Sequence, residues 1–273
     1  IPRLLHNTLD DLHLPRADIA SQIHRNLTRR PEQIPQVDLA SGALTRVDVE
    51  DQVECQIGEV EDREYREGWE QADLALQVIA SRLAEAEPDL PPLKITVYDI
   101  PVMNAFAMPG ERIVITRELI ARAGRAEQVT GVLAHEIGHV LKRHPEAGMP
   151  RAAGLQLLIS ALTGGSNSTI GSAAGLAAVL RYSREAEAEA DAIAVDLMTK
   201  SAVDTMAFRE FFEILLKEEG KPSTGVWGGL DSALSTHPGT QERIDRIKPL
   251  PDGVTPVPVL TETQWQALRD ICK

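Results

Sequence analysis

The spacing of apolar residues divides the chain after residue 61 into helices and short strands. Over residues 62–86 they recur every three or four positions, which predicts an amphipathic helix that ends before Pro88. The apolar stripe of this helix comprises Trp69, Leu76, Ile79, Ala80 and Leu83. Further helices are expected at residues 117–122 and 127–143, the second ended by Pro145.

Extended segments lie between these helices. Alternating β-branched residues at 93–99 predict a strand. Residues 104–108 and 112–116 are also extended in pattern, and Pro109-Gly110 between them predicts a tight turn. The fold class is therefore α+β and mainly α-helical, with a small antiparallel sheet or hairpin preceding the helix at 127–143.

The two ends of the chain differ in character from the central part. Residues 1–61 are rich in proline, and we interpret them as an extended arm that wraps the surface. Residues 62–250 form the main domain. Residues 251–273 form a tail, whose last part predicts a short helix that packs back. Because the chain begins at Ile1, we expect a form from which a signal peptide or anchor has been removed.

Residues 152–180 contain two apolar segments separated by a loop rich in Gly and Ser. Neither segment reaches the roughly 18 apolar residues that would span a bilayer. A helical hairpin over the active site would explain the pattern, with a mobile loop at its tip. Peripheral association with a membrane surface is the alternative.

Charge and cysteine content narrow the range of partners. The net charge of -13 and the lack of a basic stripe argue against a nucleic-acid partner. Cys55 and Cys272 form no Cys-x-x-Cys pair, so we do not expect their thiols to bind metal. They are two unrelated thiols or a disulfide that ties the tail to the N-terminal part; we favour the disulfide, which requires an oxidising compartment.

The predicted helix at 127–143 carries His135-Glu136-x-x-His139. Residues four apart share a helix face, so the two imidazoles can bind one metal ion, and Glu136 can take a proton from a nearby water. This arrangement is typical of zinc hydrolases. Two surface histidines are the alternative, which the apolar pattern around the motif disfavours. We expect His144, at the helix end, to interact with the helix dipole rather than with metal.

A zinc hydrolase needs a third protein ligand, and residues 182–191 offer three glutamates. Helical periodicity places Glu187 on the inward face of this segment and Glu185 and Glu189 on the solvated side. A buried carboxylate requires a cation, so Glu187 is the candidate ligand. Asp191, one turn along, can accept the outer N–H of a ligating histidine. The alternative is an ordinary surface helix rich in Ala and Glu.

Four motifs occur in the order seen in one protein family. They are Asn104-Ala105-Phe106-Ala107 with Pro109-Gly110, His135-Glu136-x-x-His139, Ser183-Arg184-x-x-Glu187-x-x-Ala190-Asp191, and Ser235-Thr236-His237-Pro238 followed by Glu242-Arg243-Ile244. Over residues 65–250 the chain resembles the gluzincin metallopeptidases. These include the CAAX prenyl proteases, the HtpX heat-shock proteases and the BepA-like periplasmic proteases that police outer-membrane assembly. The resemblance implies a zincin-like metallopeptidase domain at residues 62–250.

The resemblance also implies a set of site residues. The expected ligands of one Zn²⁺ per chain are His135, His139 and Glu187, with Glu136 as the general base. Asp191 would accept a hydrogen bond from one of the two histidine ligands. His237 would lie near the metal, either as a fourth ligand that keeps the enzyme latent or as a group that stabilises the transition state. Arg243 would be an ion-pair partner or an aid to the oxyanion.

The implied function is that of a zinc-dependent metalloendopeptidase acting on protein substrates in bacterial envelope quality control. Asn104, Ala105 and Phe106 would hold a peptide substrate as an added strand, although a purely structural sheet is the alternative. The implied location is the bacterial periplasm or cell envelope. In one alternative, a segment outside this chain anchors the protein to a membrane. The chain lacks the multiple membrane spans of the prenyl and heat-shock branches, and no tetratricopeptide array follows residue 243.

Two other functions stay open at this point. One is a latent, chaperone-like protein that binds unfolded proteins, with its zinc site closed by His237. The other is a purely structural zinc site, whose removal would unfold the protein.

Overall fold

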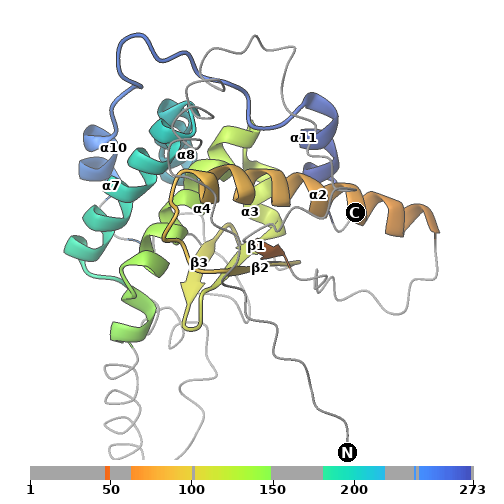
Figure 1. Cartoon of the computed structure of the whole chain (residues 1–273), viewed down its shortest axis with the longest axis horizontal. Coiled ribbons are helices and arrows are strands. Elements are labelled where there is room, and N and C mark those ends of the chain that lie inside the picture. Colours follow the sequence, from red (N-terminus) through yellow and green to blue (C-terminus); the bar gives the residue numbers. More distant parts are fainter. Residues whose placement is uncertain are drawn as a thin grey trace, which may run out of the picture. The chain divides into compact units, whose positions relative to one another are not determined.

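The computed structural model describes residues 47–49, 63–99, 102–148, 181–218, 237 and 240–271 (Figure 1). Most of the expected N-terminal arm, the apolar segments at 152–180, Cys55 and Cys272 lie outside these residues. Among the helices that are described, none combines the length and the apolar character that crossing a membrane requires.

Four short strands form one sheet in the order β1-β2-β4-β3. They are β1 (Val47–Val49), β2 (Leu93–Tyr98), β3 (Ala105–Met108) and β4 (Arg112–Thr116). The β3–β4 hairpin is antiparallel, as predicted, but β2 pairs with both β1 and β4 in parallel. The sheet is therefore mixed rather than antiparallel. The chain crosses from β2 to the outer position of β3 before it returns, so β4 lies between them.

Seven helices have both ends within the described residues. They are α2 (Arg63–Glu85), α3 (Arg117–Arg122), α4 (Ala126–Leu141), α7 (Arg184–Lys200), α8 (Thr205–Glu218), α10 (Thr240–Arg246) and α11 (Glu262–Arg269). In Figure 1, α2 and α4 lie above the sheet, and α7 and α8 lie beside α4. The helices predicted at 62–86, 117–122 and 127–143 correspond to α2, α3 and α4.

Short polar side chains cap the N-termini of three helices, including α7. Ser183 accepts a hydrogen bond from the amide of Ala186 and so caps α7. Thr116, the last residue of β4, does the same for α3 by accepting from Leu119. In the tail, Thr261 and Gln264 form a capping box that starts α11.

Helix α11 packs against α2, as the apolar residues of the tail led us to expect. Its buried contacts come from Trp265, Leu268 and, just beyond the helix, Ile271. Helix α2 supplies a row of fully buried residues to the same core, including Leu76, Ile79 and Leu83. The tail is therefore part of the hydrophobic core of the main domain.

Helix α4 is the central helix. Every one of its residues except Glu127 and Leu141 is buried, which is the pattern of a helix covered on all sides. The helix ends at Leu141, two residues before the predicted end, because Arg143 adopts a left-handed conformation with φ 55°. That backbone turn, rather than Pro145, ends α4.

Two glycines allow α4 to approach its neighbours closely. A Cβ atom at Gly138 would lie 2.9 Å from both the Cα and the carbonyl oxygen of Ala190 on α7. A Cβ atom at Gly131 would lie 2.6 Å from Cβ of Phe208 on α8. The α4–α7 contact lies next to His139 and one helical turn from Glu187. It therefore sets the distance between residues expected to share a metal ion.

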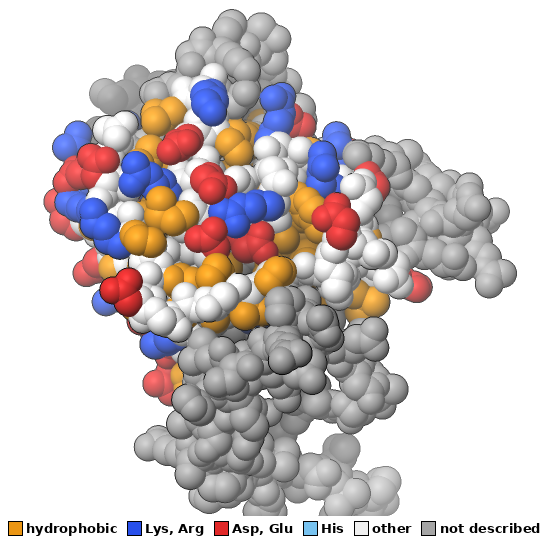
Figure 2. All heavy atoms as spheres, turned by 90° about the horizontal axis from the view of Figure 1, so that it is seen from above, with side chains coloured by type: hydrophobic (Ala, Val, Ile, Leu, Met, Phe, Trp, Pro, Cys, Tyr) orange, Lys and Arg blue, Asp and Glu red, His pale blue; other side chains and the backbone are white. Residues whose placement is uncertain are grey.

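Charges of both signs are interspersed on the face of the molecule shown in Figure 2. Lys and Arg side chains there lie between Asp and Glu side chains, with apolar residues among them. The sequence-based expectation of no nucleic-acid partner stays a prediction.

We expect Gly138→Ala to lower the free energy of unfolding by about 1–3 kcal/mol, because the added methyl group would push α7 away from α4. Urea denaturation followed by circular dichroism measures the change. Gly148→Ala is the matched control, since a Cβ atom there meets no atom of the described chain within 4 Å. An unchanged unfolding midpoint for Gly138→Ala would contradict the close contact.

Candidate metal centre

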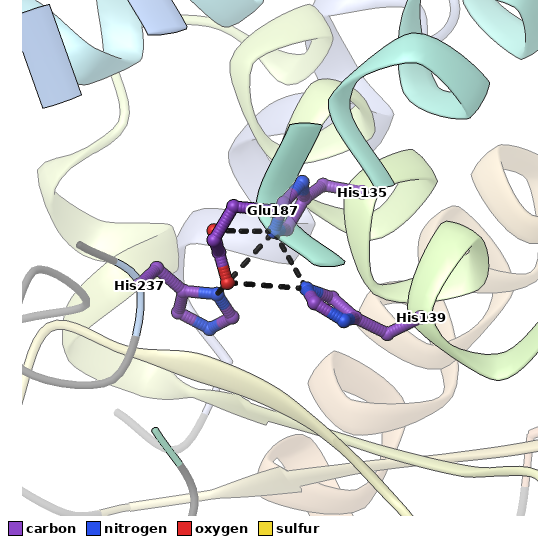
Figure 3. A group of neighbouring side chains, drawn as sticks. All are labelled: His135, His139, Glu187 and His237. Carbon is purple, nitrogen blue, oxygen red and sulfur yellow. Dashed lines mark hydrogen bonds and ion pairs between the residues drawn. The ribbon is translucent and has the colours of Figure 1, made fainter. Parts of the chain in front are cut away.

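Three histidines and one glutamate from three parts of the chain converge in the interior (Figure 3). His135 and His139 come from α4, Glu187 comes from α7, and His237 precedes α10. All four side chains are buried, and one donor atom of each lies within 4.8 Å of the others. The structure thus brings together the three ligands expected from sequence and places His237 beside them.

The donor atoms of these side chains face one another. The Nε2 atoms of His135 and His139 are 3.0 Å apart. Nδ1 of His237 lies 3.3 Å from Nε2 of His135 and 2.9 Å from Oε1 of Glu187. Oε2 of Glu187 lies 3.5 Å from Nε2 of His135, and Oε1 lies 3.5 Å from Nε2 of His139.

Each imidazole also has a partner for its outer nitrogen, the ring nitrogen that points away from the other donor atoms. Nδ1 of His135 lies 3.0 Å from Oδ1 of Asp191, the contact expected for Asp191. Nδ1 of His139 lies 2.9 Å from Nδ1 of His144. Nε2 of His237 lies 3.3 Å from the carbonyl oxygen of Ala105. If each outer nitrogen donates its proton to this partner, every inner nitrogen keeps a lone pair directed at the centre.

Lone pairs that face one another at these distances repel unless a cation lies between them. Nitrogen and carboxylate ligands bind Zn²⁺ at about 2.0–2.2 Å, so in a tetrahedral site neighbouring donor atoms are about 3.3–3.6 Å apart. The separations of 2.9–3.5 Å around Glu187 and the histidines are close to these values. All four donor atoms lie within 4.8 Å of one another, so the donor set is compatible with a single bound metal ion.

Glu187 provides a second sign of a missing cation. Its Oε2 atom is buried and accepts no hydrogen bond of good geometry, although Nη1 of Arg243 lies only 2.6 Å away as an ion-pair partner. A buried carboxylate oxygen without a hydrogen bond is costly in a folded protein. Arg243 thus compensates part of the charge on this oxygen, and a metal ion at the centre would add a second positive charge beside it.

The buried charges of the centre are unbalanced. Glu136, Glu187 and Asp191 are 1%, 1% and 4% exposed, and the buried cation that pairs with this group is Arg243. With neutral imidazoles, three negative charges against one positive charge leave two negative charges. Buried charge of this kind requires a counter-charge, and a divalent metal ion has the right one.

Arg243 fixes the two carboxylates of α7. Its Nε and Nη2 atoms donate to the two oxygens of Asp191 at 2.7 and 2.8 Å, a bidentate pair. Its Nη1 atom faces Glu187, and its guanidinium lies 4.5 Å from the ring centroid of Phe212. Of the two roles considered for Arg243, the geometry favours that of ion-pair partner.

The surroundings keep both carboxylates ionised. Burial, the largest influence, opposes ionisation of Glu187, but the neighbouring imidazoles, His237 foremost, hold its pKa well below the usual range. Burial likewise raises the pKa of Asp191, but hydrogen bonding to His135 and the charge of Arg243 outweigh it and lower the pKa to about 2. Both side chains are therefore anionic at neutral pH.

The histidines respond to these anions in different ways. Burial and Arg243 lower the pKa of His135, but Asp191 and Glu187 outweigh them and raise it to about 9. Burial keeps the pKa of His139 well below its usual value. The metal-free centre therefore attracts a proton at His135, and a metal ion would replace that proton.

Glu136 lies beside the donor cluster but outside it. Its Oε2 atom accepts a hydrogen bond of 2.7 Å from the amide of Ala107 on β3, and its Oε1 atom lies 3.6 Å from Nε2 of His237. The carboxylate therefore lies between the metal centre and strand β3. This is where a proton acceptor for a reaction at the metal would be needed.

Strand β3 lies at the edge of the described sheet and turns its outer main-chain groups towards the centre. The carbonyl oxygen of Ala105 faces His237, and that of Ala107 accepts from the hydroxyl of Tyr182 at 3.2 Å. Asn104 is buried and Phe106 is half-buried. Of the three residues expected to bind substrate, Ala105 contacts the site, while Asn104 and Phe106 flank it along the chain.

Comparison with known proteins identifies the family. Residues 70–250, most of the chain, match peptidase family M48. This chain belongs to peptidase family M48. The matched region contains the donor cluster and Glu136.

Several curated proteins are similar to this chain. It is 31% identical over 164 residues to the metalloprotease YcaL of Escherichia coli, which covers 58% of this chain and 61% of YcaL. It is 29% identical over 194 residues to the metalloendopeptidase OMA1 of Danio rerio, and the match covers 64% of this chain and 39% of OMA1. It is 30% identical over 158 residues to a Vibrio cholerae protein provisionally named a beta-barrel assembly-enhancing protease, and this match covers 52% of the chain and 31% of that protein. The chain thus spans less than two thirds of these relatives.

Two residues of this M48 site were not identified from the sequence. His144 contacts His139 from behind because the left-handed Arg143 turns the chain back, and its own Nε2 lies 3.2 Å from Oε2 of Glu189. The expected role at the helix dipole stays a prediction, and the structure adds a direct contact with His139. Tyr182 stacks on His139 with ring centroids 3.8 Å apart. Its position just before the Ser183 cap was the available signal.

We expect His144→Ala to weaken Zn²⁺ binding by about 10–100-fold, because the outer N–H of His139 loses its acceptor. Competition with a chromogenic chelator measures the affinity. His144→Gln, whose side chain can still accept a hydrogen bond, should recover part of the loss. Equal affinities for His144→Ala and the unaltered protein would rule out this supporting role.

Proposed function

We propose that this chain is a zinc-dependent metalloendopeptidase that hydrolyses peptide bonds in protein substrates. The observation that carries the proposal is the meeting of a buried, metal-fitting donor cluster with Glu136 and an edge strand. Membership of the M48 family and similarity to proteins named metalloproteases support the same activity.

The proposed zinc ligands are His135, His139 and Glu187. Two imidazoles and one carboxylate form a ligand set found in catalytic zinc sites, where a fourth position serves the reaction. When bound, zinc would supply Lewis-acid chemistry, polarising a carbonyl group and acidifying water. Asp191 and His144 would hold the two histidines in the tautomer that directs Nε2 at the metal.

Glu136 is the proposed general base. It would accept a proton from the attacking water and then pass that proton to the amine that leaves. Its hydrogen bond with the amide of Ala107 holds the carboxylate against β3, where the scissile bond of a peptide would lie. Neither step requires Glu136 to bind the metal.

A peptide substrate would bind along β3 as an added strand. In the present conformation the outward carbonyl groups of Ala105 and Ala107 are bonded to His237 and Tyr182. A substrate that pairs with these groups must first displace the two side chains. We therefore propose that β3 becomes available when His237 and Tyr182 turn away.

The biological setting that we propose is protein quality control in the bacterial cell envelope. The support comes from relatives, since YcaL is a bacterial metalloprotease and the Vibrio cholerae protein is named for beta-barrel assembly. The expected disulfide between Cys55 and Cys272 would suit an oxidising compartment. Fractionation of cells that produce the tagged chain from its natural gene would test this setting.

We expect Glu136→Gln to keep its Zn²⁺ while the rate of hydrolysis falls by about 10²–10⁴-fold, because the amide cannot accept the proton. Metal content by mass spectrometry and cleavage of a casein substrate are measured on the same sample. Glu262→Gln, a matched change at an exposed position of α11, is the control for loss of charge. Undiminished cleavage by Glu136→Gln would remove this residue from the mechanism.

His237 is proposed to occupy the fourth coordination position in the resting protein, because its Nδ1 atom faces the other donors. We expect His237→Ala to bind Zn²⁺ more weakly and to cleave casein several-fold faster per bound metal ion, since the fourth position is freed. Both quantities are measured on zinc-saturated protein. A fall in cleavage per bound ion would instead assign His237 a part in the reaction itself.

A further inference from the structure

A row of three side chains, His139, His144 and Glu189, leads from the metal centre to the protein surface. Nδ1 of His139 lies 2.9 Å from Nδ1 of His144, and Nε2 of His144 lies 3.2 Å from Oε2 of Glu189. The exposed fraction of these side chains rises along the row from 0% through 13% to 53%. One imidazole therefore connects a proposed zinc ligand to an acid that water can reach.

The backbone around His144 is held from both sides. Before it, the left-handed Arg143 turns the chain back towards α7. After it, Oε1 of Glu146 accepts a hydrogen bond of 3.2 Å from the amide of Gly110, in the turn between β3 and β4. These contacts do not involve Glu189, so a substitution at Glu189 leaves the anchors of His144 in place.

The packing of α4 on α7 brings Glu189 within reach of His144. Gly138, the neighbour of His139, touches the backbone of Ala190, the neighbour of Glu189. Glu189 points away from the metal-binding face of α7 and is exposed. The residue that follows the end of α4 can meet this exposed side only because the two helices approach so closely.

Tyr182 covers the contact between the two imidazoles. Its half-buried ring stacks on His139 with centroids 3.8 Å apart, and its centroid lies 6.1 Å from that of His144. A hydrogen bond that is shielded from water is stronger than an exposed one. The contact between His139 and His144 can therefore determine which nitrogen of each ring carries the proton.

The carboxylate of Glu189 selects one of two proton arrangements. A neutral imidazole has one N–H and one lone pair. With its proton on Nδ1, His144 would turn the Nε2 lone pair to the carboxylate, and two acceptors 3.2 Å apart repel. With its proton on Nε2, His144 donates to Glu189 and can accept the Nδ1–H of His139. Nε2 of His139 then keeps the lone pair that a metal ligand needs.

We propose that Glu189 is a positioning residue of the metal centre, which acts through His144 to fix the tautomer in which His139 binds zinc. Glu189 is not itself a ligand, and its place on the solvated side of α7 is one where substitutions ordinarily have little effect. This inference rests on the proposed zinc site and adds a residue that supports it.

Glu189→Lys tests the proposal, because an ammonium group can only donate hydrogen bonds. Lysine favours the other tautomer of His144, whose Nδ1–H opposes the N–H of His139. We expect the Kd for Zn²⁺, measured by competition with a chromogenic chelator, to rise by about 10–100-fold. Glu189→Gln, whose carbonyl oxygen can still accept from His144, should stay within about threefold of the unaltered protein.

Glu185→Lys is the matched control for the change of charge. Glu185 and Glu189 are both exposed, and they lie two residues before and two residues after Glu187 on the same helix. At 0.15 M salt we expect Glu185→Lys to raise the Kd by no more than about threefold. An equal rise in the two lysine variants would overturn the proposal.

A double-mutant cycle tests whether Glu189 acts through His144. In the His144→Ala background, Glu189→Lys and Glu185→Lys should change the Kd for Zn²⁺ equally, because the imidazole that links Glu189 to His139 has been removed. A larger effect of Glu189→Lys in that background would assign Glu189 a direct effect on the metal and overturn the proposed route.

Nuclear magnetic resonance of protein with ¹⁵N-labelled histidine reads the tautomer of His144 without any metal. At pH 8 an ordinary imidazole is neutral. We expect the proton on Nε2 in the unaltered protein and on Nδ1 in Glu189→Lys, with His144→Ala identifying the signals. The same tautomer in both proteins would overturn the inference. If the unaltered protein bound no Zn²⁺, the proposed metallopeptidase would fail, and these spectra would still decide the role of Glu189.

Discussion

The buried negative charge of Glu187 and Asp191 is the constraint on which this structure depends. Two carboxylates on one face of α7 are removed from water, and each must find a cation. Arg243 supplies one counter-charge and ties α10 to α7. The imidazoles around Glu187 complete the centre either by carrying a proton, as the raised pKa of His135 indicates, or by sharing a metal ion with it. A divalent metal ion would therefore balance the buried charge of the centre as well as supply reactivity.

The close packing of α4 against α7 and α8 sets the distances between the groups of the centre. Helix α4 is buried on all sides, and Gly138 lets it touch the backbone of α7 beside His139. The same close approach at Gly131 brings Phe208 of α8 against α4. As a result α4 has the helix of Glu187 on one side and the phenylalanines of α8 on the other. The candidate metal ligands and the apolar wall beside them therefore come from different helices that pack on α4.

The arrangement around β3 links resting and active states. The outward carbonyl groups of this edge strand are bonded to His237 and Tyr182, both of which also contact the metal centre. Groups that would pair with a peptide are therefore occupied by side chains that cover the metal ligands. Substrate binding and opening of the centre would accompany each other, because both need these two side chains to move.

The sequence by itself determined the local elements and the identity of the chemistry. Apolar spacing was sufficient for α2, α3, α4 and the β3–β4 hairpin, because such spacing reports which face of a local segment is buried. The inward face calculated for residues 182–191 selected Glu187 and Asp191, which are the buried acids of α7. The roles of the N-terminal arm and of the two cysteines stay predictions.

Only the tertiary structure decided the features that depend on contacts between distant segments. Parallel pairing of β2 with β4 follows from the route of the chain, which periodicity does not encode. His144 reaches His139 because one backbone angle at Arg143 is left-handed. Phe208 reads as an ordinary core residue in the sequence, and only the packing of α8 on α4 places it against Gly131. Local pattern shows that a side chain is buried, but which atoms it meets is set by the packing of whole helices.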